Sequence, residues 1–265
     1  MVIDFHAHIY PEKIAAKAVE NIGEFYKIPM ACNGTTGGLV ESGLRGGIDR
    51  FVVFSAAAVP AQVSVINDYV ASAVDARKGK TPSFTGVGTL HRDMADPAGE
   101  IERMIGLGLK GIKLHPDMQK FDIDDKKMMD MYAMLEGRMI AIFHTGDYRY
   151  GFSHPSRLAK VLDAFPALTA VAAHFGGWSL YDLALEYFRG RSCYLDVSSA
   201  IPYLGMERAR ELIRIYGAER ILFGSDFPMW DPASCLEEFN RIDLRDDERE
   251  LILYKNALRI LQPAR

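Results

Sequence analysis

The chain has 265 residues, of which 31 are Lys or Arg and 35 are Asp or Glu, so its formal net charge is −4. Hydrophobic residues make up 49% of the chain and charged residues 25%, as in ordinary globular proteins. A mildly acidic chain without a basic cluster is a poor binder of nucleic acids or anionic membranes, and no apolar run approaches the roughly 18–20 residues of a membrane helix. The three cysteines are scattered, which predicts no disulfide framework and favours a reducing compartment, the cytoplasm; they are Cys32, Cys193 and Cys235.

Eight short runs rich in Val, Ile, Leu and Phe follow one another along the chain. Near-continuous apolar runs of this length are typical of parallel strands that are buried on both faces. The runs predict strands at residues 2–8, 49–56, 84–91, 111–115, 139–144, 168–174, 193–199 and 220–226.

Segments with helical periodicity separate these runs. The predicted helices cover residues 11–27, 62–78, 97–108, 124–136, 155–164, 178–188, 205–217 and 246–261. Asp96-Pro97 is a capping residue followed by a first-turn proline, which is a typical helix start. The glycine-rich segment 32–38 lacks the lysine and the spacing of a phosphate-binding loop, so we expect a mobile loop there.

Strands and helices that alternate in this way predict an α/β fold. Eight strands favour a (β/α)8 TIM barrel formed by residues 1–265 as a single domain. An open, doubly wound sheet would show the same alternation of strands and helices. Only the number of strands favours the barrel over that fold.

The positions of the histidines are the most informative feature of the sequence. Six of the seven lie in predicted strands, at or near the end where the chain leaves the strand: His6, His8, His91, His115, His144 and His174. The carboxyl ends of the strands form the rim that carries the active site in α/β barrels. We therefore expect these imidazoles to gather at one end of the molecule.

Several of these side chains form a candidate metal site. His6 and His8 are two residues apart on a strand, so both side chains point to the same face. Asp226 ends the eighth strand, where a buried carboxylate is costly unless it is paired or bound to a metal. Imidazole and carboxylate together suit zinc or a similar ion. The alternatives are core histidines bonded to backbone carbonyls, and an Asp226 that caps a helix or pairs with an arginine.

The motifs VIDFHAH, GIKLHP, IFHTG, AHFGG and GSDFP together resemble the amidohydrolase superfamily. Within it, the chain is similar to the amidohydrolase-related group that includes aminocarboxymuconate-semialdehyde decarboxylase. The resemblance extends over nearly the whole chain and implies a distorted (β/α)8 barrel with a metal at its mouth. It implies His6, His8, His144 and Asp226 as metal ligands, and His174 as a further ligand or the acid/base residue.

The fourth strand departs from the pattern of binuclear members of this superfamily, which usually carry a bridging carboxylated lysine or a glutamate at its end. Here the strand reads GIKLHP, and Lys113, a candidate for carboxylation, shares a face with His115. Two divalent ions with one carboxylate and neutral imidazoles would leave an excess of positive charge. We therefore expect one divalent ion, with zinc favoured and manganese, iron and nickel as alternatives.

Further residues are candidates for contacts with substrate. Tyr148 and Arg149 follow the fifth strand, and the Arg149 guanidinium could bind a carboxylate, although a solvated loop arginine is an equal alternative. His115 and Trp178 could line the pocket or only pack beneath it. Residues that could support the site from outside the ligand set are Lys113, His91 and His154, of which His154 could equally cap a helix.

The leading functional hypothesis is a metal-dependent hydrolase that uses a metal-activated water on a small ester, lactone or amide, which could carry a carboxylate. Asp226 and His174 are the predicted catalytic residues. A decarboxylase or hydratase on the same scaffold is the alternative, and a barrel that binds a metal or metabolite without turnover is a third hypothesis. The expected partner is a small molecule rather than a nucleic acid or a membrane, and the sequence leaves a homo-oligomer open.

Overall fold

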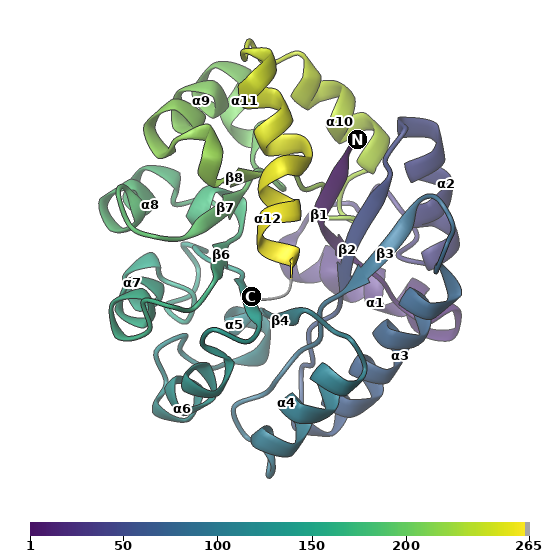
Figure 1. Ribbon diagram of the computed structural model, residues 1–265, viewed down its shortest axis with the longest axis vertical. Helices are drawn as coiled ribbons and strands as arrows, with labels where there is room; N and C mark the ends of the chain where they lie inside the picture. The colour runs from purple at the N-terminus through teal and green to yellow at the C-terminus, as the bar shows by residue number, and fades with distance from the viewer. Residues whose placement is uncertain (263–265) are drawn as a thin grey trace.

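The computed structural model describes residues 1–262, and its eight parallel strands follow one another around a barrel (Figure 1). Strands β1 to β3 pair in order, as do β4 to β8. Parallel bridges between Gly88 and Ile112 and between Ala7 and Phe227 join the two sets, so the barrel is closed. The strands are β1 Ile3–His8, β2 Arg50–Phe54, β3 Ser83–Gly86, β4 Gly111–Leu114, β5 Ile140–Phe143, β6 Ala170–Ala172, β7 Tyr194–Asp196 and β8 Ile221–Leu222. The predicted (β/α)8 barrel is confirmed.

Helices surround the barrel as an outer ring (Figure 1). The predicted start at Asp96 is confirmed, because its carboxylate accepts the Gly99 N–H at 2.9 Å. The helices are α1 Glu12–Tyr26, α2 Thr36–Gly46, α3 Val63–Ala76, α4 Pro97–Gly106, α5 Pro116–Gln119, α6 Lys126–Leu135, α7 Pro155–Ala164, α8 Tyr181–Phe188, α9 Ile201–Tyr216, α10 Pro232–Asn240, α11 Asp246–Glu250 and α12 Asn256–Leu261.

Three of these helices, α2, α5 and α10, are absent from the sequence prediction, and α5 is a short one that directly follows β4. The expected loop at 32–38 is wrong from residue 36 onward, because α2 begins there with the Thr35 hydroxyl capping the Gly38 N–H at 3.0 Å. Helix α10 was not predicted at all. Helices α2 and α10 pack together so closely that a Cβ on Gly46 would lie 2.9 Å from the Cα of Ala233. Packing between helices thus outweighs the low helix propensity of a glycine-rich segment.

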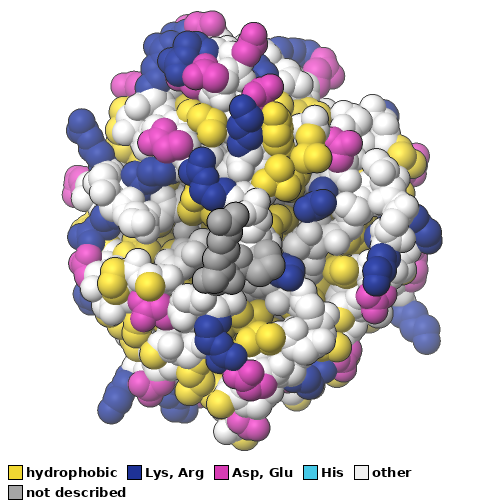
Figure 2. Space-filling model, viewed as in Figure 1, with side chains coloured by type: hydrophobic (Ala, Val, Ile, Leu, Met, Phe, Trp, Pro, Cys, Tyr) yellow, Lys and Arg dark blue, Asp and Glu magenta, His cyan; other side chains and the backbone are white. Residues whose placement is uncertain are grey.

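The apolar core lies in two layers. A larger cluster fills the space between strands and helices, and a smaller one fills the barrel interior. Helix α12 crosses the end of the barrel where the strands begin, and its Ala257 joins the interior cluster (Figure 1). Figure 2 shows basic and acidic side chains interspersed over this closed end. The carboxyl ends of the strands face the opposite side of the molecule.

An irregularity in β1 directs the first two histidines into the barrel. The pairing of β1 with β2 shifts register between Asp4 and Ala7. As a result, Phe5 packs in the interior cluster, while His6 and His8 both line a pocket above it. The Asp4 carboxylate fixes this bend by accepting the N–H groups of His6 and Ser225, each at 3.0 Å. Bulges of this kind re-aim side chains next to functional sites.

Among residues 1–262, the structure contains no helix with the length and apolar character needed to cross a lipid bilayer.

Candidate metal centre

The carboxyl ends of the strands enclose a pocket with a cavity of about 50 Å³. The five predicted metal ligands all line it: His6, His8, His144, His174 and Asp226. Lys113 and His115 line it as well. Residues far apart in the sequence are therefore brought together as the histidine pattern predicted.

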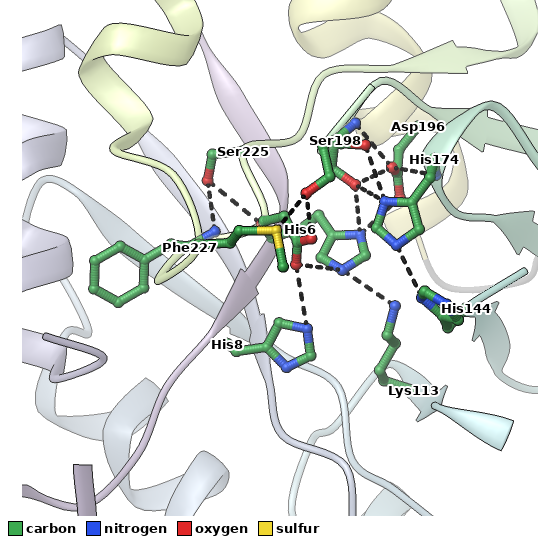
Figure 3. Close-up of polar contacts among 12 residues, drawn as sticks. His6, His8, Lys113, His144, His174, Asp196, Ser198, Ser225 and Phe227 are labelled. Carbon is green, nitrogen blue, oxygen red and sulfur yellow. Dashed lines mark hydrogen bonds and ion pairs between the residues drawn. The ribbon is translucent and has the colours of Figure 1, made fainter. Parts of the chain in front are cut away.

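Hydrogen bonds fix the tautomers of two of these histidines (Figure 3). The Nδ1 of His6 lies 2.9 Å from Oδ2 of Asp196, and the Nδ1 of His174 lies 2.9 Å from the carbonyl oxygen of Ser198. Both neighbours are acceptors, so each Nδ1 carries the proton and each Nε2 keeps its lone pair. Metal-binding histidines are oriented by such partners in many proteins. His6 and His174 form a group with Asp226 in which one ligand atom of each residue lies within 4.8 Å of the others.

The distances around Asp226 match a common ion. Its Oδ1 lies 3.4 Å from Nε2 of His6 and 3.5 Å from Nε2 of His8. Two neighbouring ligand atoms bonded to one ion at about 2.0–2.1 Å are separated by about 2.9–3.6 Å, for angles of roughly 90–120° at the ion. The other oxygen, Oδ2, accepts the Ser199 hydroxyl at 2.5 Å, so Oδ1 is the oxygen that remains for an ion.

His144 adds a contact that favours a cation. Its Nδ1 lies 3.1 Å from Nε2 of His174, the atom that carries a lone pair. Its Nε2 is buried without a hydrogen-bond partner, and Oδ2 of Asp117 lies 3.6 Å away. If the His144 proton lies on Nε2, where it faces the Asp117 carboxylate, then Nδ1 of His144 carries a lone pair. That lone pair would point at the lone pair on Nε2 of His174. A cation bound to both nitrogens removes this repulsion, and so the donor set fits a metal ion.

Burial keeps the imidazoles neutral, which is the form that binds metals. Desolvation lowers the pKa of His6, His8 and His144 well below the usual value, and that of His174 to about 3. Desolvation also raises the pKa of Asp226 to about 7, while its hydrogen bond from Ser199 and the nearby Lys113 oppose this rise. A bound cation would offset the cost of burying the ionised carboxylate.

The backbone is strained at the same place. His174, Ser199 and Asp226 have φ values of 58°, 51° and 64°, in the left-handed region that non-glycine residues seldom adopt. Such conformations cost of order 1–3 kcal/mol each and cluster at functional sites. Gly224 allows β8 to approach β1 here, because a Cβ at this position would lie 2.8 Å from the Cβ of His6.

Lys113 is fully buried in the same pocket. Its Nζ lies 3.1 Å from Nε2 of His6 and 5.2 Å from the centre of the Phe54 ring. Desolvation lowers its pKa to about 8, although Asp196 and Asp226 favour its charged form. The ammonium group therefore competes with an ion for His6, and the lowered pKa reduces the cost of neutralising it.

The structure corrects the expected roles of the residues after β5. Tyr148 is 73% exposed and does not line the pocket. The Arg149 guanidinium is already engaged, because Nε and Nη2 donate to Asp147 and Nη1 donates to the carbonyl of Phe25 at 2.6 Å. It therefore offers no free pair of donors for a substrate carboxylate. Trp178 is buried beside the pocket, against the Tyr26 ring, rather than in its lining.

Two of the predicted supporting residues lie outside the pocket. His91 accepts the N–H of Asp93 at 3.2 Å and packs edge-on against Phe121. His154 caps α7, where it accepts the N–H of Ser156 at 3.2 Å. Both satisfy local backbone groups, so the helix-capping alternative holds for His154. His91 is a packing residue against Phe121.

The sequence prediction did not single out four residues that the structure places at the site: Asp117, Asp196, Ser198 and Tyr26. Asp196 ends β7, so the rule that drew attention to Asp226 applies to it equally. Ser198 follows two residues later and bridges His6 and His174 through its hydroxyl (Figure 3). Tyr26 ends α1 and Asp117 lies in α5, positions without a signal in the strand pattern.

Comparison with known proteins agrees with this geometry. A family model described as amidohydrolase (Amidohydro_2) matches residues 3–262. The chain belongs to the amidohydrolase family. Because the members of this family are metal-dependent enzymes, the protein is an enzyme of that kind, and the resemblance in the strand motifs is confirmed. A search of curated proteins finds no match.

Solved structures share the fold of this amidohydrolase at low sequence identity. An uncharacterised TIM-barrel protein from Bordetella bronchiseptica has a TM-score of 0.80 and 23% identity, with 98% of each chain covered. A 5-carboxyvanillate decarboxylase from Novosphingobium aromaticivorans, complexed with manganese, has a TM-score of 0.75 and 16% identity, covering 98% of this chain and 96% of that one. A Pseudomonas putida protein assigned as a 2-pyrone-4,6-dicarboxylic acid hydrolase has a TM-score of 0.69 and 21% identity, covering 98% of this chain and 97% of that one. These likenesses establish the barrel for this chain.

Proposed function

We propose that this amidohydrolase is a hydrolase that acts on a small ester, lactone or amide with one divalent ion held by His6, His8, His144, His174 and Asp226. The observation that supports it most directly is the placement of Oδ1 of Asp226 at 3.4 and 3.5 Å from the Nε2 atoms of His6 and His8. Zinc suits this mixture of imidazoles and one carboxylate, and manganese is the alternative that a structurally similar decarboxylase contains.

A bound ion of this kind supplies Lewis-acid polarisation of a carbonyl oxygen and lowers the pKa of water. Asp226 accepts the proton of the attacking water, because its Oδ1 lies beside the Nε2 atoms of His6 and His8 while its Oδ2 is held by the Ser199 hydroxyl. His174 acts as a ligand rather than as the acid, since its Nδ1 donates to Ser198 and its lowered pKa, about 3, makes Nε2 a poor proton acceptor. Asp196 and Ser198 hold the imidazoles in place.

A lyase is the second candidate, and Lys113 is the observation that favours it. Its buried Nζ is a cationic group on the pocket wall that could pair with a substrate carboxylate. Structurally similar proteins include a 5-carboxyvanillate decarboxylase. The two candidates differ in product, because hydrolysis releases an acid and a decarboxylase releases carbon dioxide.

The experiment that tests the proposal is a substrate screen on the zinc- and manganese-loaded protein. Acid release from small esters and lactones is followed in a pH-stat, and amine release from small amides is followed with an amine-reactive dye. Carbon dioxide release from aromatic acids is followed in parallel. We expect acid release that falls roughly 100-fold or more in Asp226→Asn and is unchanged in Tyr148→Phe, an exposed control. Carbon dioxide without acid release would replace the hydrolase by the lyase.

A further inference from the structure

The end of helix α1 covers the metal pocket. Ile22 and Tyr26 contribute to the lining of the cavity, although α1 lies outside the barrel. Arg149 holds this end of the helix. Its guanidinium donates to the carbonyl of Phe25 at 2.6 Å and lies 5.0 and 5.6 Å from the ring centres of Phe25 and Tyr26. The same guanidinium is fixed to Asp147, so the helix end is tied to the loop that follows β5.

The hydroxyl of Tyr26 meets a histidine whose tautomer is defined. His115 precedes α5, and its Nδ1 accepts the N–H of Met118 at 3.3 Å. Because Nδ1 accepts this backbone N–H, the proton of the neutral ring lies on Nε2. That nitrogen lies 2.5 Å from the Tyr26 oxygen. His115 therefore donates to Tyr26, and not the reverse.

The proton of Tyr26 is left without an acceptor. Within residues 1–262, the His115 contact is the hydrogen bond that the structure gives to this hydroxyl, and there the oxygen is the acceptor. Tyr26 lines the cavity together with Asp226 and His144. A phenol is protonated at neutral pH, so Tyr26 carries this proton. A buried donor in this position is available to a molecule that enters the pocket.

We propose that Tyr26 is a catalytic residue that donates a hydrogen bond to the substrate oxygen on which negative charge develops. His115 is the positioning residue, because its Nε2–H occupies the Tyr26 lone pair and turns the tyrosine proton toward the pocket. This proposal rests on the proposed function, since it needs a carbonyl or carboxylate oxygen beside the ion. The proposed substrate contains an oxygen that becomes anionic during the reaction. The carbonyl oxygen of an ester or lactone under attack by water is such an oxygen.

The geometry separates this role from packing alone. A tyrosine that only closed the pocket would be served by its ring, which packs against Trp178 with a centroid distance of 5.0 Å. Phenylalanine would then replace it without loss. Tyr150 is the matched control, because its ring stacks on Phe25 at the same helix end while its hydroxyl lies outside the pocket lining.

The test uses acetohydroxamate, a small anionic ligand whose oxygens bind metal ions, and the full-length protein loaded with zinc. Calorimetry gives its dissociation constant for the wild type, Tyr26→Phe, Tyr150→Phe, His115→Leu and the double variant of Tyr26 and His115. We expect Tyr26→Phe to bind about 10- to 100-fold more weakly with unchanged zinc content and unchanged circular dichroism, and Tyr150→Phe to bind as the wild type does.

His115→Leu distinguishes positioning from a purely structural role. We expect it to weaken acetohydroxamate binding in the wild type but to have little further effect in the Tyr26→Phe background, since the two residues act through one hydroxyl. Additive losses would assign His115 a separate, structural role. Binding by Tyr26→Phe within twofold of the wild type, at normal zinc content, would overturn the proposal for Tyr26.

The same data keep this proposal apart from the proposed function. If the wild type retains neither zinc nor manganese, both are wrong. If it retains zinc and Tyr26→Phe weakens acetohydroxamate binding while no substrate is hydrolysed, the proposed reaction is wrong and the role of Tyr26 stands.

Discussion

At the scale of single residues, the site depends on where protons sit. Asp196 accepts from Nδ1 of His6 through Oδ2, and through Oδ1 it accepts the N–H groups of His174 and Ser198. One carboxylate therefore orients two of the candidate ligands. Asp196 ends β7, so the search for polar residues at strand ends could have identified it. Its hydrogen-bond partners could not be predicted, because residues 6, 174 and 196 come together only in the folded barrel.

Asp196→Asn tests this orientation. An amide can donate to Nδ1 of His6, which would move the imidazole proton to Nε2 and remove the lone pair that faces the pocket. We expect zinc affinity to fall about 10- to 100-fold, measured by competition with a chromophoric chelator. The exposed variant Asp182→Asn serves as the control. Equal zinc affinities in both variants would contradict the orienting role.

Asp226 gives a prediction for the pH dependence of stability. Burial raises its pKa to about 7 in the protein without an ion, above the value of an unfolded chain. The folded state therefore holds this proton more tightly, and its contribution to stability is present below about pH 4 and is lost as the pH rises through 7. In chelator-treated protein we expect Asp226→Asn to melt a few degrees above the wild type at pH 8, with a smaller difference at pH 5. Calorimetric scans that show the opposite trend would contradict the burial argument.

At the scale of elements, the strands were predictable and parts of the helical layer were not. Eight buried apolar runs predicted the eight strands because a parallel sheet hides both faces of every strand. Helix α2 is rich in glycine and forms because it packs on α10, a contact that local sequence does not reveal. The start of helix α10 did carry a sequence signal, a capping aspartate followed by a first-turn proline at Asp231-Pro232. In the structure the Asp231 side chain accepts the Ser234 N–H at 3.0 Å. The strand pattern did not indicate that the end of α1 would cover the pocket, because α1 lies outside the barrel.

Arg149→Ala tests how the end of α1 is held. The substitution removes the hydrogen bond to the Phe25 carbonyl and the contacts with the rings of Phe25 and Tyr26. We expect amide hydrogen exchange in residues 20–27 to become about tenfold faster while exchange in the strands is unchanged. Arg157→Ala, which removes an arginine paired with Asp122 and Asp124 instead, should leave this segment as it is. Unchanged exchange in the Arg149 variant would show that helix packing alone holds α1.

At the scale of the whole molecule, barrel closure creates the site. β1 and β8 come from opposite ends of the sequence, yet the N–H of Asp226 donates to the carbonyl of His6 at 2.8 Å. Metal binding and the stability of the fold are therefore linked, because an ion bound between β1 and β8 favours the closed barrel. The sequence predicted the gathering of these side chains from their place at the strand ends. It could not predict which of their atoms face one another.

This linkage predicts a thermal shift. An ion present at a thousand times its dissociation constant stabilises the folded state by about 4 kcal/mol. For a chain of this size we expect the metal-loaded protein to melt roughly 10 °C above the chelator-treated protein, measured by differential scanning calorimetry. His6→Ala should show little of this shift. Equal melting temperatures with and without the chelator would contradict the link between the ion and the fold.

The central claim is that one divalent ion binds among imidazoles and a carboxylate contributed by β1 and by the segments that follow β5, β6 and β8. Elemental analysis by mass spectrometry of the purified wild type and of His6→Ala and Asp226→Asn tests it most directly. We predict one divalent ion for each wild-type chain and close to none in either variant. A wild type without metal, two ions for each chain, or full occupancy in both variants would contradict the account.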